Sequence, residues 1–229
     1  MNEVYRKEKK FLITLDEYIK KRHMLQQLMR PDSHSRANEG YMIRSLYFDT
    51  VFDEDFDDKV AGVELRRKIR LRIYDTKSDF AMFEMKQKQG DAQLKRSLRV
   101  TRADAVKIAA GDYSPLLEYN EPFAAECYAL MNYKCYRPKA IVQYSRFAFV
   151  AGENKTRLTF DSNVEATESC FDIFSDKLNM NPVIDRNAVI LEVKYDGFLL
   201  EYIRRMINSI NRSEISVSKY ILARQTSYK

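Results

Sequence analysis

The sequence predicts an α+β fold in which antiparallel strands form a tunnel, an eight-stranded β-barrel with a charged lumen, flanked by helices. Cationic and apolar residues alternate in nearly every strand candidate, as in RKIRLRIYD from Arg67 to Asp75. Short strand candidates follow one another with turn-like residues between them, which favours an antiparallel meander. The helix candidates are amphipathic and numerous enough to cover the apolar faces of such a sheet.

Local signals place each element along the chain. Thr14 and Glu17 form a capping-box pattern at the start of the first helix. Thr101 caps a short helix that Gly111 ends, and Pro122 stands near the first turn of the next helix. The strand candidates lie at 5–13, 41–50, 63–75, 80–88, 93–101, 139–150, 156–161 and 188–196. The helix candidates lie at 14–30, 101–111, 121–134, 198–210 and 216–226.

Composition restricts the classes of function. A chain of 229 residues with 45% hydrophobic residues and no Pro/Gly/Ser linker is expected to form a single domain over 1–229. The formal charge of +6 favours an anionic partner. The aromatic residues lie mainly on apolar faces, so no stacking platform for nucleic acid is expected. His23 and His34 are the only histidines. A histidine-based zinc site and a Ser-His-Asp triad are therefore improbable, and any metal would be a hard cation such as Mg²⁺ or Mn²⁺.

Cysteine usage and the absence of a signal peptide indicate a reducing, cytoplasmic location. Cys127, Cys135 and Cys170 are an odd and unclustered set, and buried thiols are expected. No apolar run approaches the roughly 20 residues that a membrane helix needs.

The charged rows of different strands share one composition. Arginine and lysine dominate them, with single glutamates, whereas the opposite faces are strongly apolar. The rows comprise Arg6, Glu8 and Lys10; Lys68, Arg70 and Arg72; Glu84, Lys86 and Lys88; Tyr144 and Arg146; Arg157, Thr159 and Asp161; and Glu192 and Lys194. The outer face of an ordinary sandwich would show mixed charges. We therefore expect the apolar faces to lie under helices and the charged faces to line the inside of a closed sheet, whose size at about eight strands suits side chains or one small ligand.

Such a concentration of cations predicts an anionic ligand. Burying an ion costs several kcal/mol, so the charged interior should hold water and bind a polyanion. The planar fork of arginine grips phosphate oxygens at two points, and lysine adds a point charge. A triphosphate or a phosphate chain fits this arrangement. The carboxylates Glu8, Glu84 and Glu192 would either orient the cations or bind metal. The two roles are equally open for Glu8 and Glu84, and the metal role is favoured for Glu192.

These residues, in this order, resemble the polyphosphate polymerase domain of the vacuolar transporter chaperone (VTC) family. This family is a branch of the triphosphate tunnel metalloenzymes, which also include the CYTH phosphohydrolases. The resemblance extends along nearly the whole chain. It is carried by the segments RKEKK, SLYFDT, KIRLRIY, FEMK, LKRS, YSRFAF, RLTFD, LEVK and SVSKY.

The resemblance implies an eight-stranded antiparallel tunnel that binds ATP and inorganic polyphosphate and uses a divalent metal, Mn²⁺ or Mg²⁺. The γ-phosphoryl group of ATP passes to the chain end and ADP is released. The implied catalytic residues are Arg70, Arg72, Lys86, Arg146 and Arg157. The implied phosphate-binding residues are Lys10, Lys95, Tyr144, Lys194, Ser218 and Lys219. The implied metal ligand is Glu192, with Glu8 and Glu84 as further candidates. Lys68 has no place in the family motif and is assigned to the tunnel mouth.

One departure favours the polymerase branch. The hydrolytic branch begins with E-x-E-x-K, whereas Arg6 stands at the first glutamate position here, which leaves one carboxylate fewer for metal. A tunnel hydrolase or cyclase acting on a nucleoside, thiamine or inorganic triphosphate is the alternative, followed by a non-catalytic polyphosphate or nucleotide binder. The membrane helices of the eukaryotic complex have no counterpart in the sequence. Any peripheral association with a membrane would therefore need a separately encoded partner.

Overall fold

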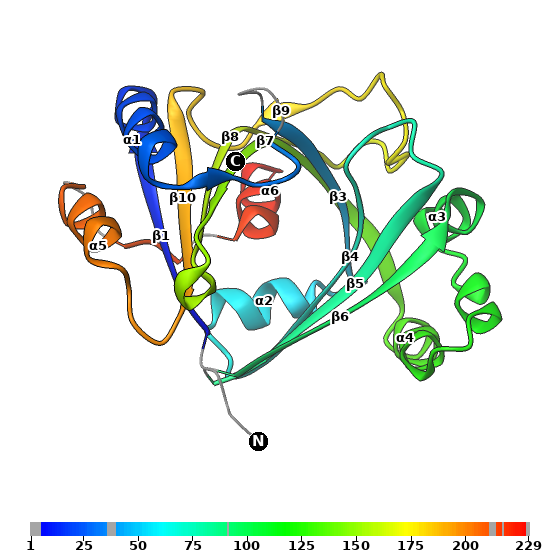
Figure 1. The fold of residues 1–229 in the computed structure, drawn as a ribbon. Coiled ribbons are helices and arrows are strands. Elements are labelled where there is room, and N and C mark those ends of the chain that lie inside the picture. The colour runs from blue at the N-terminus through cyan, green and yellow to red at the C-terminus, as the bar shows by residue number, and fades with distance from the viewer. Residues whose placement is uncertain (1–5, 36–39, 91, 211–213, 217, 228–229) are drawn as a thin grey trace. The chain divides into compact units, whose positions relative to one another are not determined.

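The computed structural model describes residues 6–35, 40–90, 92–210, 214–216 and 218–227, which form an α+β fold with antiparallel strands (Figure 1). The chain divides into two compact units. Unit 1 comprises Met1–Met42, Tyr144–Val164 and Ile184–Ser218, and unit 2 comprises Ile43–Gln143, Glu165–Val183 and Lys219–Lys229. The α+β class and the antiparallel pairing are thus confirmed, whereas closure into an eight-stranded tunnel and the single domain stay predictions.

Unit 1 contains one run of paired strands in the order β1-β10-β8-β7. Its elements are β1 (Arg6–Thr14), α1 (Leu15–Leu28), β2 (Arg30–Pro31), the second half of β7 (Tyr136–Val150), η3 (Glu153–Lys155), most of β8 (Arg157–Thr167), β10 (Ala188–Asp196) and α5 (Glu201–Asn208). Helices α1 and α5 lie on one side of the β1–β10 pair (Figure 1). Phe160, Leu191 and Ile203 are buried in one apolar cluster, which places the core on the helix side of these strands. The charged side chains of the same strands point to the opposite face.

The predicted capping box begins helix α1. Thr14 Oγ1 accepts a hydrogen bond from the backbone N–H of Glu17 at 3.2 Å, and Glu17 Oε2 accepts one from the backbone N–H of Thr14 at 2.9 Å. Further along helix α1, the buried side chain of Lys21 donates hydrogen bonds to Met206 O and to Ser209 Oγ, where α5 ends. An ammonium group there compensates the carbonyl end of a helix. Lys21 is therefore a structural cation of unit 1.

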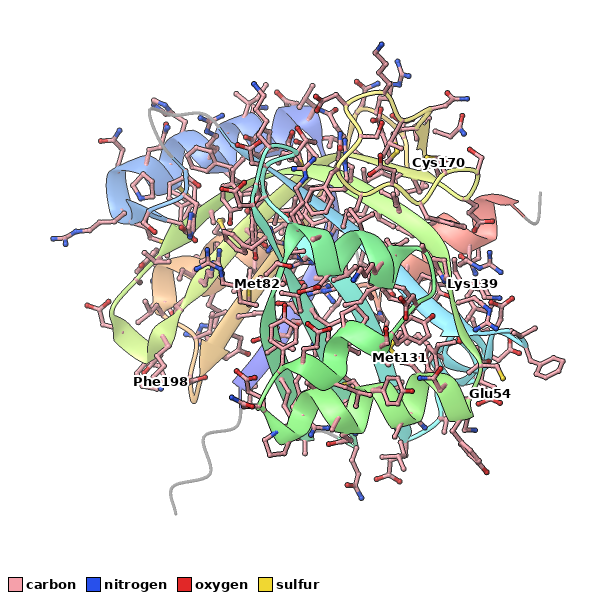
Figure 2. All side chains as sticks on the ribbon, turned by 90° about the vertical axis from the view of Figure 1, so that its right-hand side faces the viewer. Glu54, Met82, Met131, Lys139, Cys170 and Phe198 are labelled. Carbon is pink, nitrogen blue, oxygen red and sulfur yellow. The ribbon has the colours of Figure 1, made fainter. Side chains whose placement is uncertain are left out.

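Unit 2 contains paired strands in the order β7-β3-β4-β5-β6. Its elements are most of β3 (Tyr41–Thr50), α2 (Glu54–Val60), β4 (Leu65–Ile73), β5 (Phe80–Gln89), β6 (Ala92–Thr101), α3 (Arg102–Ala109), η2 (Ser114–Glu118), α4 (Pro122–Tyr133), the first half of β7, the end of β8, β9 (Asn181–Pro182) and α6 (Lys219–Ser227). Helices α3 and α4 cover the face of β5 and β6 that carries the apolar residues (Figure 1). Figure 2 faces this helix layer, with Met131 labelled on α4.

The core of unit 2 confirms the predicted apolar face of RKIRLRIYD. Ile69, Leu71 and Ile73 are buried together with Cys127 and Met131 of helix α4 in one apolar cluster. Because side chains alternate along a strand, this packing leaves Lys68, Arg70 and Arg72 on the face away from α3 and α4.

Helix α2 was not predicted, and its start depends on a buried carboxylate of the segment SLYFDT. Asp49 accepts the backbone N–H groups of Asp55 and Phe56, each at 2.9 Å, and Tyr220 of α6 donates its hydroxyl to the same carboxylate at 2.7 Å. Carboxylates satisfy the exposed N–H groups of a first helical turn. Asp49 is therefore a structural anchor for both α2 and α6.

The prediction of buried thiols is correct for Cys127 and wrong for Cys135 and Cys170, which are exposed. Cys135 follows helix α4 with a φ of 51°, in the left-handed region where helices commonly end. Cys135 therefore lies beyond the end of α4 and does not continue its buried face.

Shortening a core side chain of α4 should destabilise the protein. Met131 is fully buried, so Met131→Ala is expected to lower the free energy of unfolding by about 2–5 kcal/mol through lost contacts and a cavity. Chemical denaturation measures the change. Tyr133→Ala on the same helix, where the side chain is 86% exposed, should change stability by about 0.5 kcal/mol or less. Equal effects of the two substitutions would contradict the packing described for α4.

Candidate functional site

The polar face of unit 2 is organised around one buried carboxylate, Glu84 on β5. The antiparallel register places Arg70 of β4 directly opposite Glu84. Arg70 Nε and Nη2 lie 2.7 Å and 2.6 Å from Glu84 Oε2, and Lys95 Nζ of β6 contacts Oε1. Both carboxylate oxygens are thus engaged by cations. We call Arg70, Arg72, Glu84 and Lys95 the Glu84 cluster.

Electrostatics keep Glu84 ionised. Burial alone would raise its pKa, but the charges of Arg70, Arg72 and Lys95, with the hydrogen bond from Lys95, outweigh burial and lower the pKa to about 2. An anion at the centre of this cluster reduces the repulsion among the cations. Of the two roles predicted for Glu84, its contacts therefore favour that of orienting the cations.

Strand β3 supplies two hydroxyl groups that hold the arginines. Arg70 Nη1 donates to Tyr47 Oη at 3.3 Å, and Arg72 Nε donates to Ser45 Oγ at 3.0 Å. Burial acts to raise the pKa of Tyr47, but the positive charges of Arg70, Arg72 and Lys68 outweigh it and lower the pKa to about 8. The Tyr47 ring also stacks on Tyr220 with 5.2 Å between ring centroids. Ser45 and Tyr47 therefore fix where the two guanidinium groups point.

Four predicted residues of unit 1 form a second charged group, which we call the Glu8–Glu192 cluster. Strands β1 and β10 place Glu8 opposite Lys194, and Lys10 opposite Glu192. Lys10 Nζ lies 2.5 Å from a Glu8 oxygen and 3.5 Å from a Glu192 oxygen. Lys194 Nζ lies 2.5 Å from the other Glu192 oxygen and 3.6 Å from the other Glu8 oxygen. Each carboxylate therefore contacts both ammonium groups.

The charges of this cluster act on one another. Burial and the charge of Glu192 act to raise the pKa of Glu8, but the charges of Lys194 and Lys10 outweigh them and lower it. For Lys10, burial acts to lower the pKa, and the charges of Glu192 and Glu8 outweigh burial and raise it. Glu8 and Lys10 are consequently both charged at neutral pH.

The two predicted arginines of unit 1 are each anchored by an aspartate. Arg146 makes a two-point contact with the fully buried Asp161, with Nε–Oδ1 at 2.6 Å and Nη2–Oδ2 at 2.8 Å. Arg157 Nη2 donates to Asp32 Oδ2 at 2.5 Å and to Tyr41 Oη at 3.1 Å. These contacts hold each guanidinium group by one edge.

The predicted site residues divide between the two units. Unit 1 contains Glu8, Lys10, Tyr144, Arg146, Arg157, Glu192, Lys194 and Ser218. Unit 2 contains Arg70, Arg72, Glu84, Lys86, Lys95 and Lys219. Of these, Tyr144 lies beside Arg146, with the guanidinium carbon 5.3 Å from the ring centroid. Ser218 directly precedes α6, and Lys219 is the first residue of that helix, as predicted for its first turn. The role of each residue stays a prediction.

The sequence reasoning missed several residues that support this set. Asp32, Asp161, Ser45 and Tyr47 contact predicted cations and received no role. Thr159 is a further case, because its hydroxyl is buried and has no hydrogen-bond partner within the described ranges, although Thr159 lies opposite Glu192. In SLYFDT, Ser45 and Tyr47 stand two residues apart, as Arg70 and Arg72 do in β4. This shared spacing was the sequence signal that could have placed both hydroxyl groups opposite the arginines. No local signal identified Asp32.

Of the three carboxylates predicted as metal ligands, Glu8 and Glu192 have the arrangement that best fits a divalent metal. Mg²⁺ typically binds one or two carboxylates and completes its shell with water and substrate phosphates. Glu8 and Glu192 offer such hard oxygen donors side by side, which fits Mg²⁺ or Mn²⁺ shared with a phosphate ligand. Within the part of the chain that the structure describes, no group of three or more His, Cys, Asp and Glu side chains is arranged to hold a metal ion. A metal here would therefore depend on oxygens from the substrate.

The fold and the two charged clusters define a class of α+β protein that carries arginine and lysine rows on neighbouring antiparallel strands. The chain belongs to the VTC domain family, whose model matches residues 5–228. This family is part of the triphosphate tunnel superfamily, whose members typically act on triphosphates. The predicted family is thus confirmed.

The chain is similar to several solved structures at low sequence identity. A candidate adenylate cyclase from Bacillus halodurans is 12% identical, with 93% of this chain and 95% of that chain covered and a TM-score of 0.52. A candidate adenylate cyclase from Vibrio parahaemolyticus is 13% identical, with 89% and 85% covered and a TM-score of 0.47. A conserved hypothetical protein from Pyrococcus furiosus is 10% identical, with 94% and 99% covered and a TM-score of 0.46. No curated protein sequence matches the chain.

Among the residues that the structure describes, no helix combines the length and the apolar character needed to cross a bilayer.

Replacing the central carboxylate of the Glu84 cluster should destabilise the protein in a pH-dependent way. Because the pKa of Glu84 falls from 4.5 to about 2 on folding, its stabilisation is complete above about pH 4.5 and is lost as the pH falls toward 2. We expect Glu84→Gln to melt below the wild type at neutral pH, and the difference to shrink toward pH 2. Thermal unfolding followed by circular dichroism at several pH values measures this.

The control for that experiment is Glu118→Gln, which alters an exposed carboxylate of unit 2. It should match the wild type at every pH. A constant difference between Glu84→Gln and wild type over the whole acid range would show that the charge of Glu84 does not stabilise the cluster.

Proposed function

We propose that this protein is a metal-dependent polyphosphate polymerase that transfers the γ-phosphoryl group of ATP to the end of an inorganic polyphosphate chain. The observation that supports it most is the Glu84 cluster, where two arginines lie side by side on a strand and are fixed by a buried carboxylate and two hydroxyl groups. Membership in the VTC domain family also supports the proposed function. The predicted eight-stranded tunnel and single 1–229 domain belong to this proposal.

The transfer itself is a substitution at phosphorus. A terminal oxygen of the polyphosphate chain forms a bond to the γ-phosphorus, and the bond from that phosphorus to the β,γ-bridging oxygen breaks, so that ADP leaves. This chemistry needs alignment of the reacting groups and neutralisation of charge more than a protein nucleophile. A set of cations in fixed positions can supply both requirements.

The arginines provide directed hydrogen bonds to phosphate oxygens. Arg70 and Arg72 are held by Glu84, Tyr47 and Ser45, so little reorganisation is needed when charge develops in the transition state. Arg146 and Arg157 are held in the same manner by Asp161 and Asp32 and keep further N–H groups for the ligand. We assign these four arginines, with Lys86, to binding the phosphates that react.

The remaining lysines and the carboxylates complete the assignment. Lys10 and Lys194 would contact phosphate oxygens in unit 1, and Lys95 and Lys219 in unit 2, with Tyr144 and Ser218 as hydroxyl donors. Glu192, together with Glu8, would hold the divalent metal. When bound, Mg²⁺ or Mn²⁺ would neutralise charge on the phosphate oxygens. Lys10 and Lys194 already contact both carboxylates, and they would then orient these side chains.

Product analysis tests the proposal directly. Purified protein is incubated with ATP and Mn²⁺ or Mg²⁺, and the products are separated by gel electrophoresis and anion exchange. Phosphate chains appearing together with ADP are the expected result. Free phosphate without chains would identify a hydrolase, cyclic AMP with pyrophosphate would identify a cyclase, and polyphosphate binding without turnover would identify a binding protein. Each of these three outcomes would contradict the polymerase proposal.

Removing the charge of the proposed metal ligand should stop turnover. We expect Glu192→Gln to lower activity at least 10- to 100-fold, the effect known for weaker perturbations around metal ligands, in a variant that circular dichroism shows to be folded at the assay temperature. Glu153→Gln alters an exposed carboxylate of the same unit and should keep full activity. Full metal-dependent activity of Glu192→Gln would place the metal elsewhere.

A further inference from the structure

Three lysines form a row across neighbouring strands of unit 2. Lys68 of β4 lies directly opposite Lys86 of β5, and Lys86 lies directly opposite Lys95 of β6. Like charges placed directly opposite each other on a sheet are destabilising. The row therefore concentrates positive charge on one part of the sheet. Lys68 also has no counterpart in the motifs that identify the family.

The lysine row shares Lys95 with the Glu84 cluster and lies on the same face of the sheet. Lys68 is two residues before Arg70, and Lys86 is two residues after Glu84, so period-two alternation puts them on the charged face. Lys68 also contributes, with Arg70 and Arg72, to the positive potential that lowers the pKa of Tyr47 against the effect of burial. Lys68 and the two arginines therefore act on the same hydroxyl group from one face of the sheet.

The lysine side chains of the row are more exposed to solvent than Glu84 and Arg72. Glu84 is 3% exposed and Arg72 is 8% exposed. Lys68 and Lys86 are partly exposed, and the side chain of Lys95 is 51% exposed. A ligand bound at Arg72 and Arg70 would therefore reach water by passing the lysine row.

The dimensions of the row suit an extended polyanion. Adjacent strands are about 4.8 Å apart, so three lysines in register span roughly 10 Å across the sheet, the length of several phosphate units. Lysine presents a strongly hydrated charge on a flexible stem and does not impose the two-point geometry of arginine. Such a row can hold a repeating phosphate chain without fixing its register.

We propose that Lys68, which lies in register with Lys86 and Lys95, forms an outer subsite that binds the part of a polyphosphate chain lying beyond the phosphates held at Arg70, Arg72 and Lys86. This inference rests on the proposed function. It adds one binding residue, Lys68, and the direction in which the bound phosphate chain runs. The reacting phosphates lie at the buried arginines, and the chain leads outward over the lysines.

The test compares a long polyphosphate with tripolyphosphate as ligands for Lys68→Gln. Loss of one charge-assisted contact should weaken binding of the long chain about 10-fold. It should also reduce the slope of log affinity against log salt concentration by about 0.7, the share of one phosphate contact on a single strand. Tripolyphosphate, which is short enough to be held at the arginines alone, should bind with unchanged affinity. Calorimetric titration at three salt concentrations measures all of these quantities.

Two further variants serve as controls for charge and folding. Lys68→Arg keeps the charge and should restore long-chain affinity to within about twofold of the wild type. Lys107→Gln removes an exposed lysine of α3, on the helix-covered side of unit 2, and should bind both ligands as the wild type does. The melting temperatures of all three variants show whether they are folded.

The outcomes separate this inference from the proposed function. An unchanged long-chain affinity of Lys68→Gln, or an equal loss for both ligands, would overturn the outer subsite while polymerase activity of the wild type could still stand. Failure of the wild type to bind either ligand or to make chains would overturn the proposed function itself.

Discussion

Repulsion between cations on one face of a sheet is the constraint on which this structure depends. Arg70, Arg72 and Lys95 lie close together in unit 2, and the buried Glu84 lies between them with both oxygens engaged. Unit 1 uses the same solution in another form, since Glu8 and Glu192 alternate with two lysines. Leaving a buried charge without such a partner costs several kcal/mol. The carboxylates thus allow the cations to stay concentrated when no ligand is bound.

The two faces of each set of strands have different roles: one stabilises the fold, and the other carries the residues proposed to bind the ligand. Apolar residues on one face pack under α3 and α4 in unit 2 and under α1 and α5 in unit 1, and they supply the burial that stabilises the fold. The charged face contributes little such apolar burial and carries the residues of the proposed site. Hydroxyl groups such as Tyr47 and Ser45 then add direction, because they hold guanidinium groups in place instead of neutralising them. Charge and geometry at the proposed site therefore have separate sources.

Local patterns predicted the elements well, and contacts between distant segments were not predictable. The strands Tyr41–Thr50 and Ala188–Asp196 begin and end where the sequence patterns predicted, and the capping box of Thr14 is present. The partner of Arg157 is Asp32, 125 residues away, and no periodic signal connects them. Helix α2 was missed because it begins on a carboxylate from β3 and not on a local cap. The lysine row likewise became visible only with the strand register, since each lysine alone resembles a solvated residue.

The central claim is that each of the two charged clusters binds phosphate groups of a phosphate chain. The most direct test is the melting temperature of the wild-type protein with and without saturating tripolyphosphate, compared with sulfate at equal ionic strength. A ligand that binds the native state and relieves the repulsion among its cations raises the melting temperature with increasing concentration. We predict such a rise for tripolyphosphate and a much smaller one for sulfate. A melting temperature that does not change at saturating tripolyphosphate would contradict the account.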